Sequence, residues 1–291
     1  MALQFIFGNS GSGKSGYLYR SVLEQAEREP ERNFLVLVPE QFTMQTQREL
    51  VGMQRNHAII NVDVLSFARL AYRVFDELGK QELVVLEETG KNLMLRKVAE
   101  QQKGNLRVLG GNMNKMGYVD EVKSLISELV QYNVSPEVLD DFLKDETLGE
   151  SLRLKLEDIA TLYREFEKYK EGRFITAEEV LGLLYDVAEE SAILRDCVIV
   201  FDEFTGFTPI QNRLMERFMK LAKEVVVSVT MDSREDFYRT AGVHELFAMS
   251  KKTVQTLLRI ATEQHVEVKD PVVLPGGEKM RYANAPALYF M

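Results

Sequence analysis

Residues 8–15 read Gly8-Asn9-Ser10-Gly11-Ser12-Gly13-Lys14-Ser15 and satisfy the pattern G-x-x-x-x-G-K-[ST] in full. The glycines can adopt backbone angles that other residues avoid, so successive N–H groups can point inward at phosphate oxygens. Lys14 supplies a positive charge for the β- and γ-phosphates, and the Ser15 hydroxyl is a suitable Mg²⁺ ligand. The stretch therefore predicts a nucleoside triphosphate site, with ATP and Mg²⁺ as cofactors.

The residues around this loop indicate an α/β fold. Five short apolar runs have the composition of buried strands, and their continuous apolarity is typical of parallel strands covered on both faces. Helical periodicity follows the first run, from Lys14 to about Glu29, and the third run, from Phe67 to Leu78. Alternation of strand and helix predicts a doubly wound parallel sheet. The five runs are Leu3–Phe7, Phe34–Val38, Ala58–Val64, Val198–Phe201 and Val225–Val229.

The middle of the chain has a different character. From about residue 83 to residue 187 no convincing strand is visible, and helical periodicity dominates. Ser135-Pro136 has the form of an N-cap followed by proline, and Thr176 with Glu179 has the form of a capping box. We therefore expect an α/β P-loop domain that is interrupted by a large all-helical insertion. The expected parts are 1–82, the insertion 83–190, and 191–291.

A second motif pairs two carboxylates at the end of an apolar strand. Val198–Phe201 is followed directly by Asp202 and Glu203. In a parallel sheet the carboxyl end of this strand lies beside the phosphate loop, so Asp202 is expected to complete the Mg²⁺ shell. Glu203 is then the candidate catalytic base that activates the attacking water. The two motifs are almost 190 residues apart, which favours a motor domain with an insertion over a small nucleotide kinase.

The bulk composition excludes several other classes of protein. The 291-residue chain is 45% apolar and 28% charged, as is usual for a globular protein, and its formal net charge is −9. This charge argues against a basic nucleic-acid-binding domain, so any contact with nucleic acid would have to come from a local groove or from a partner. Cys197 is the single cysteine, and the three scattered histidines, His57, His244 and His265, have no ligand spacing. No apolar run is long enough for a membrane span and no signal sequence is visible, so we expect a cytoplasmic protein with no membrane contact.

Other segments resemble a known group of motors. The run Asp-Glu-Phe-Thr-Gly-Phe-Thr-Pro-Ile-Gln from Asp202 to Gln211 is similar to the second motif of the UvrD/Rep superfamily-one helicases, in which a glutamine follows Asp-Glu-Phe. Leu37–Thr43 and Val64–Ala71 resemble segments of these helicases that touch single-stranded DNA. Ser228–Asp232 retains only the aspartate of the third helicase motif.

The match to one family is narrower and covers essentially the whole chain. Val-Pro-Glu-Gln at 38–41, Leu-Ser-Phe-Ala-Arg-Leu at 65–70 and Phe-Thr-Gly-Phe-Thr-Pro at 204–209 together resemble the AddB family of ATP-dependent helicase/deoxyribonuclease B subunits. This resemblance implies a RecA-like domain with a parallel sheet, in which Glu203 and Gln211 act in catalysis. It also implies DNA contact, for which the Thr43 and Ser66 hydroxyls at helix starts are the candidates.

The same resemblance implies features of a larger assembly. Members of the family pair with a helicase–nuclease A subunit as a heterodimer and act on single- and double-stranded DNA. The complex is a hydrolase that processes double-strand breaks for homologous recombination. A second motor domain, a nuclease domain and an iron–sulfur cluster are also implied, but the cluster's cysteines are not in this chain. We expect all three beyond Met291, because the apolar end from Pro275 onward has the character of a cut within a longer chain.

Two other functions are compatible with the sequence. One is a stand-alone P-loop kinase or phosphotransferase, although the helical insertion offers no obvious arginine-rich lid for an acceptor. The other is a nucleotide-gated DNA-binding module that does not hydrolyse ATP. For the isolated chain we expect nucleotide binding with little hydrolysis, because helicase-type sites need an arginine from a second domain and only one domain is visible.

Overall fold

The structure is a computed structural model that describes residues 1–54, 58–80, 85–113, 115–132, 134–145, 147–171, 174–242 and 244–274. The chain forms two compact units. Unit 1 contains Met1–Gly79, Leu184–Phe207 and the chain from Gln211 onward, and unit 2 contains Lys80–Leu183 with Thr208–Ile210. Residue His57, the expected boundary between 82 and 83, and the tail from Pro275 lie outside the described residues.

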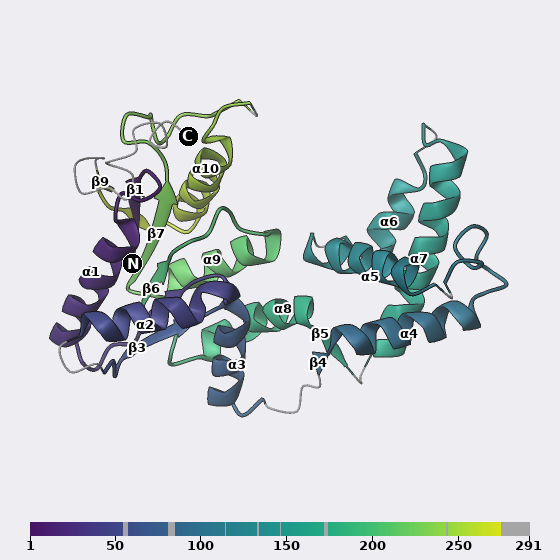
Figure 1. Cartoon of the computed structure of the whole chain (residues 1–291), viewed down its shortest axis with the longest axis horizontal. Helices are drawn as coiled ribbons and strands as arrows, with labels where there is room; N and C mark the ends of the chain where they lie inside the picture. Colours follow the sequence, from purple (N-terminus) through teal and green to yellow (C-terminus); the bar gives the residue numbers. More distant parts are fainter. Residues whose placement is uncertain are drawn as a thin grey trace. The chain divides into compact units, whose positions relative to one another are not determined.

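Unit 1 is built on a parallel sheet (Figure 1). The strand order is β3-β2-β6-β7-β1-β8. Strand β8 pairs with the start of β1, at Ala2 and Leu3, and β9 pairs with its end, from Ile6 to Gly8. Every pairing within the described residues is parallel. The parallel α/β class expected from the apolar runs is therefore confirmed. The strands are β1 (Ala2–Gly8), β2 (Phe34–Leu37), β3 (Val62–Leu65), β6 (Val198–Phe201), β7 (Glu224–Thr230), β8 (Glu267–Val268) and β9 (Val272–Leu274).

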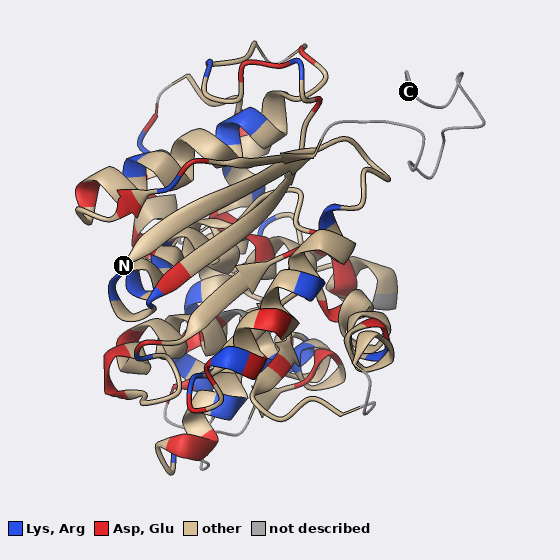
Figure 2. Ribbon diagram, turned by 90° about the vertical axis from the view of Figure 1, so that its left-hand side faces the viewer, with Lys and Arg blue, Asp and Glu red and all other residues tan. Residues whose placement is uncertain are grey.

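Helices cover both faces of this sheet. Alternate strand residues such as Ile6, Val200 and Val226 pack in one apolar cluster with α1 (Lys14–Arg28) and with Leu50 of α2 (Thr43–Met53). Phe201 points to the other face, where its ring contacts Phe67 of α3 (Phe67–Glu77) and Phe218 of α9 (Pro209–Leu221). Helix α10 (Ala248–Glu263) also contacts β7. Figure 2 shows the strands almost free of charged residues, which lie on the helices and loops, as burial on both faces requires.

Two details of the predicted strands are wrong. The third apolar run predicts a strand over Ala58–Val64, but β3 begins only at Val62, and Ile60 is 95% exposed. The side-chain amide of Asn61 donates to three backbone carbonyls, those of Ala26, Glu29 and Arg32. These bonds hold a bend in the chain directly before β3. Strands β8 and β9 are not predicted, because two- and three-residue strands at the sheet edge leave almost no apolar pattern.

Unit 2 is predominantly helical, but the expectation of an all-helical insertion is wrong. A short parallel pair, β4 (Val85–Leu86) with β5 (Ile175–Thr176), joins its two ends. The expected helix start at Ser135 is confirmed, because the Ser135 hydroxyl accepts from the Val138 N–H. At Thr176 half of the expected capping box is present: the Glu179 carboxylate accepts from the Thr176 N–H at 2.7 Å, but the Thr176 hydroxyl has no hydrogen-bond partner within the described residues. The helices are α4 (Glu88–Gln101), α5 (Met116–Gln131), α6 (Pro136–Phe142), α7 (Glu150–Lys170) and α8 (Ala177–Val187), the last of which continues into unit 1.

A buried carboxylate organises the glycine-containing loop of unit 2. The Asp158 side chain on α7 is 2% exposed, and it accepts hydrogen bonds from three consecutive backbone N–H groups, those of Arg107, Val108 and Leu109, at 2.7–2.9 Å. These bonds satisfy all three backbone amides, and a buried amide without a hydrogen-bond partner would be costly. Asp158 therefore fixes the loop between α4 and α5 onto α7.

We predict that Asp158→Asn lowers the free energy of unfolding by about 3 kcal/mol, because the new amide NH₂ faces N–H donors and the charge-assisted bonds are lost. Urea denaturation followed by circular dichroism measures this change. Asp141→Asn is the matched control, since Asp141 lies on the surface of α6 and pairs with Lys144 at 2.6 Å. Equal losses for the two variants would contradict the prediction.

Candidate functional site

The phosphate loop connects β1 to α1 with two glycines in the left-handed region. Gly11 has φ 75° and Gly13, which precedes the first residue of α1, has φ 88°. Residues with a Cβ rarely adopt such angles, so these positions need glycine. At Gly8 the space is tight instead: an added Cβ would lie 2.4 Å from the Ser12 hydroxyl oxygen and 3.1 Å from the Leu274 carbonyl oxygen, so a larger residue would force the Ser12 side chain to move. The motif thus has the backbone that its sequence predicts.

Lys14 is folded into this loop. Its side chain is buried, and its ammonium donates to the backbone carbonyls of Gly8 and Asn9, both at 3.0 Å. Burial lowers the pKa of Lys14, while the negative charges of Asp202 and Glu203 act in the opposite direction. The ammonium therefore lies where the loop closes, with two carboxylates near enough to stabilise its charge.

Asp202 is a buried carboxylate at the carboxyl end of β6. It is 1% exposed; its Oδ1 accepts a hydrogen bond from the Ser228 hydroxyl of β7, and its Oδ2 has no hydrogen-bond partner within the described residues. The Tyr19 phenol on α1 is close enough that the charge of Asp202 adds to burial in raising the pKa of Tyr19. A buried carboxylate oxygen without a donor is costly unless a cation reaches it, so this geometry fits a Mg²⁺-binding role.

Glu203 has a strained backbone. Its φ is 63°, in the left-handed region that a side chain with a Cβ disfavours, and its side chain is exposed. The strained turn directs the carboxylate back to the phosphate loop, where Oε1 accepts a hydrogen bond from the Ser15 hydroxyl at 3.3 Å. Outliers of this kind persist where the surrounding structure enforces them, and they are concentrated at functional sites.

An aromatic cluster enforces this turn. Phe204 and Phe207, which follow Glu203, pack on each other at 5.3 Å between ring centroids and on Phe201 of β6 at 6.0 and 5.5 Å. Phe67 at the start of α3 contacts Phe204 at 5.6 Å. The apolar residues of the Asp-Glu-Phe run therefore fix the chain that carries the two carboxylates.

These parts line one open pocket of about 420 Å³ at the carboxyl end of the sheet. Lys14 is the single cationic side chain among its described lining residues. Gln211, the second predicted catalytic residue, lies in the first turn of α9 and is not among these lining residues. The lining comes from the phosphate loop and from the ends of β6 and β7, namely Ser10, Gly11, Gly13, Lys14, Ser15, Gly16, Asp202, Glu203, Phe204, Thr205, Ser228 and Thr230.

The two predicted DNA-contacting hydroxyls are both buried and engaged within the chain. The Thr43 hydroxyl donates to the Glu40 carbonyl at 2.9 Å. The Ser66 hydroxyl donates to the Glu40 carboxylate and also accepts from the Arg69 N–H, as the N-cap of α3. Arg69 Nε donates to the same carboxylate at 2.9 Å. Glu40 of the Val-Pro-Glu-Gln run therefore ties the end of β2 to the start of α3.

Comparison with known proteins confirms the resemblance to the AddB family. The sequence profile of the family described as "ADDB, N-terminal" matches residues 5–291. The chain belongs to the AddB N-terminal family.

Three curated relatives of this AddB-family chain are each described as the B subunit of an ATP-dependent helicase/deoxyribonuclease. The chain is 43% identical to the protein of Lachnoclostridium phytofermentans over 99% of its own length, and 33% identical to that of Clostridium kluyveri over 99%. The protein of Clostridium acetobutylicum is 30% identical over 100% of the chain. The chain spans 25% of the length of each of these relatives.

Sequence reasoning missed two residues of the candidate site, Ser228 and Tyr19, which lie against Asp202. It named Asn9 and Asp232 but not the contact between them, in which the Asn9 side chain donates to Asp232 Oδ2 at 3.2 Å. Hydrogen bonds from Arg234, with that of Asn9, lower the pKa of Asp232. A signal was present for Ser228, since it is a polar residue within the otherwise apolar run Val225–Val229.

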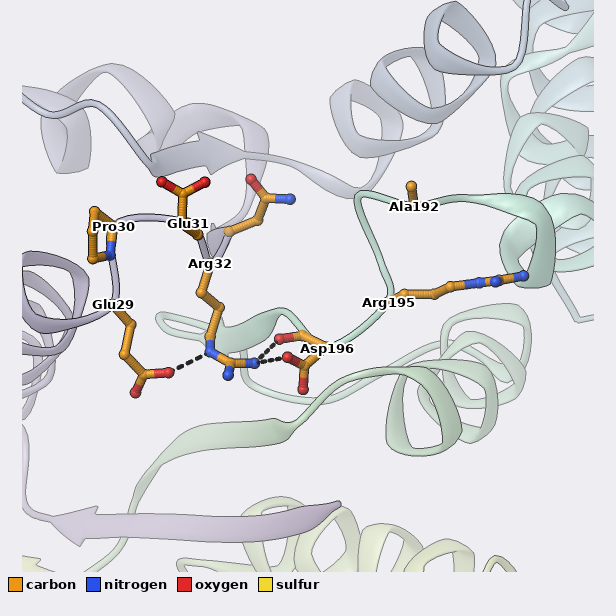
Figure 3. Close-up of a pocket in the computed structure, with 8 residues that line it drawn as sticks. Glu29, Pro30, Glu31, Arg32, Ala192, Arg195 and Asp196 are labelled. Atoms are coloured by element: carbon orange, nitrogen blue, oxygen red, sulfur yellow. Dashed lines mark hydrogen bonds and ion pairs between the residues drawn. The ribbon is translucent and has the colours of Figure 1, made fainter.

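A second pocket, of about 320 Å³, lies at the opposite edge of the sheet, where β2 and β6 begin (Figure 3). Arg32 crosses it and pairs with Glu29 on one side and Asp196 on the other. Its guanidinium is thus neutralised by two carboxylates, and Lys223 adds a further ion pair to Glu29 at 2.9 Å. This pocket is an ion-paired crevice that ties the loops together, and we assign no ligand to it.

The remaining predicted features add no site to the described parts of unit 1 or unit 2. Cys197 is buried, its thiol donates to the Leu194 carbonyl at 3.1 Å, and burial raises its pKa to about 12. One cysteine cannot hold an iron–sulfur cluster. Within the described ranges no group of three His, Cys, Asp or Glu side chains is arranged to hold a metal ion, and no described helix is long and apolar enough to cross a membrane.

We predict that Glu203→Gly has a free energy of unfolding about 1 kcal/mol higher than Glu203→Ala, because only glycine adopts the left-handed backbone without a Cβ penalty. Both variants lack the carboxylate, so the comparison isolates backbone strain. The same pair of substitutions at Glu24, an exposed position within α1, should differ by a similar amount with the opposite sign. Denaturant titration of the four variants tests this. If the Gly variant at position 203 were less stable than the Ala variant, as is expected at position 24, backbone strain at Glu203 would be refuted.

Proposed function

We propose that unit 1 is a RecA-like, helicase-type ATP-binding domain, and that the chain is the N-terminal part of the B subunit of a helicase–nuclease complex. The observation that carries this proposal is one pocket that holds the phosphate loop, Lys14, Asp202 and Glu203 together. Residues almost 190 positions apart in the sequence line the same space. Membership of the AddB N-terminal family supports the same reading.

The residues present fit ATP and Mg²⁺. The loop amides and Lys14 would hold the phosphates, and Ser15 with Asp202 would hold Mg²⁺, which neutralises phosphate charge when bound. The partnerless Asp202 Oδ2 belongs to the pocket lining and is a buried polar atom of the described structure that a ligand would satisfy. Glu203 would orient the attacking water or accept its proton. Gln211, which is not among the described lining residues of the pocket, is the second proposed catalytic residue.

The complex-level part of the proposal follows from the relatives. Their names describe a subunit of an ATP-dependent helicase/deoxyribonuclease, so we propose an A subunit as partner, DNA as substrate and a role at double-strand breaks in recombination. Thr43 and Ser66 remain proposed DNA contacts. The Ser66 hydroxyl can contact DNA only if it gives up its hydrogen bond to the Glu40 carboxylate. The Glu40 carboxylate and a DNA phosphate would therefore compete for this hydroxyl.

We predict that Lys14→Ala lowers ATP affinity by about 10- to 100-fold, because the charge that faces the phosphates is removed. Titration with a fluorescent ATP analogue measures the affinity, and circular dichroism checks that the fold persists. Lys220→Ala, an exposed position on α9, is the matched control and should bind as the parent chain does. Equal affinity of the Lys14 variant and the parent would overturn the site assignment.

We also predict that the chain alone hydrolyses ATP at least about a thousandfold more slowly than a motor at roughly ten turnovers per second. The reason is that no arginine is found among the described residues of the pocket lining, and such an arginine stabilises charge in the transition state. Steady-state ATPase assays with and without single-stranded DNA, on the chain and on its Glu203→Gln variant, measure this. Motor-like turnover by the isolated chain would contradict it.

A further inference from the structure

Asp202 lies on the sheet face covered by α1 and α2. Within β6, Val200 is on this face, and the alternation of side chains puts Asp202 on the same side. The same argument puts Ser228 of β7 beside Val226 on this face, and Phe201 pairs with Val227 in the parallel register. The carboxylate and the hydroxyl are therefore brought together by the register of two neighbouring strands.

The side chains in direct contact with Asp202 on this face carry neutral hydroxyl groups, and the Lys14 ammonium stabilises its charge at longer range. Ser228 is 5% exposed, and Tyr19 of α1, 2% exposed, lies in the same apolar cluster as Val200 and Val226. The Tyr19 hydroxyl is 3.3 Å from that of Thr46 on α2, which is 3% exposed. Neutral donors orient a carboxylate without cancelling its charge, whereas an arginine or lysine in direct contact would cancel it.

The hydroxyl of Ser228 would not remain buried in an apolar strand without a partner, because an unpaired buried hydroxyl is costly. Its bond goes to Oδ1 of Asp202, so one carboxylate oxygen is occupied and Oδ2 is left without a partner in the described structure. Ser228 itself lines the pocket beside Thr230. The bond thus selects which oxygen of Asp202 is available to a cation.

We propose that Ser228 is a positioning residue that holds Asp202 by its Oδ1 and so presents Oδ2 to the Mg²⁺ of a bound nucleotide. This inference rests on the proposed ATP site and deepens it. Ser228 acts through Asp202 and is not a ligand of the phosphates. Its loss should therefore weaken the Mg²⁺-dependent part of nucleotide binding and spare the part that the loop amides and Lys14 supply.

The test is a Mg²⁺ titration of the purified chain with a fluorescent ATP analogue, beside a titration of the analogue in EDTA. For Ser228→Ala we expect the Mg²⁺ concentration at half-saturation to rise about tenfold, with affinity in EDTA unchanged and an unchanged circular dichroism spectrum. Ser228→Thr keeps the hydroxyl and should restore the parent value. Ser21→Ala, which removes a hydroxyl on α1 that accepts a hydrogen bond from the Gln25 side chain, is the control and should match the parent.

The outcomes separate this inference from the proposed function. If the parent chain binds no nucleotide under either condition, the ATP site itself is refuted. If the parent shows Mg²⁺-dependent binding and Ser228→Ala has the same Mg²⁺ requirement, the positioning role alone is refuted. Equal loss of binding with Mg²⁺ and in EDTA, or failure of Ser228→Thr to restore the parent value, would also overturn it, since Ser228 would then support the loop or the fold.

Discussion

The parallel register of β1, β7 and β6 is the constraint on which the candidate site depends. Gly8 pairs with Thr230, and Phe201 pairs with Val227, so the three strands end at the same edge of the sheet. The backbone carbonyl of Gly8 is fixed twice there, by the Met231 N–H at 3.1 Å and by the Lys14 ammonium at 3.0 Å. A shift of one residue in the β6–β7 pairing would turn Ser228 or Asp202 to the opposite face and separate them.

The hydrogen-bond partners of the two buried charges at this end of the sheet are neutral groups, which supports the proposed binding of a cation and a polyphosphate. Asp202 is buried and accepts a hydrogen bond from a neutral hydroxyl, while Lys14 is buried and donates hydrogen bonds to neutral carbonyls. Each of the two charges stabilises the other at longer range, but their hydrogen bonds are to neutral groups of the described chain. Burial raises the cost of leaving such charges uncompensated, so a ligand that carries both Mg²⁺ and phosphate oxygens matches both.

Unit 2 is stabilised by different means. Its core is apolar and helical, with Leu95, Val98, Leu162 and Phe166 among its most buried residues. The polar element that orders it is Asp158, which satisfies three amides of the loop between α4 and α5. The two-residue pair β4–β5 brings the ends of the inserted segment together, so the insertion closes on itself and interrupts the sheet domain without extending its strands. Long insertions between elements of a sheet domain are tolerated when their ends are close.

The sequence by itself determined the local features of this protein. The phosphate loop, the strands at 3–7, 34–38, 198–201 and 225–229, the caps at Ser135 and Thr176, and the acidic pair at Asp202 and Glu203 follow from glycine geometry, apolar patterning and capping chemistry over a few residues. Only the tertiary structure decided which side chains meet. The Ser228–Asp202 bond, the Glu40–Ser66 bond, the strained turn at Glu203, the short edge strands and the position of Gln211 outside the pocket lining all depend on strand register and packing between distant segments. No local pattern encodes these contacts, because their energies come from partners far away in the chain.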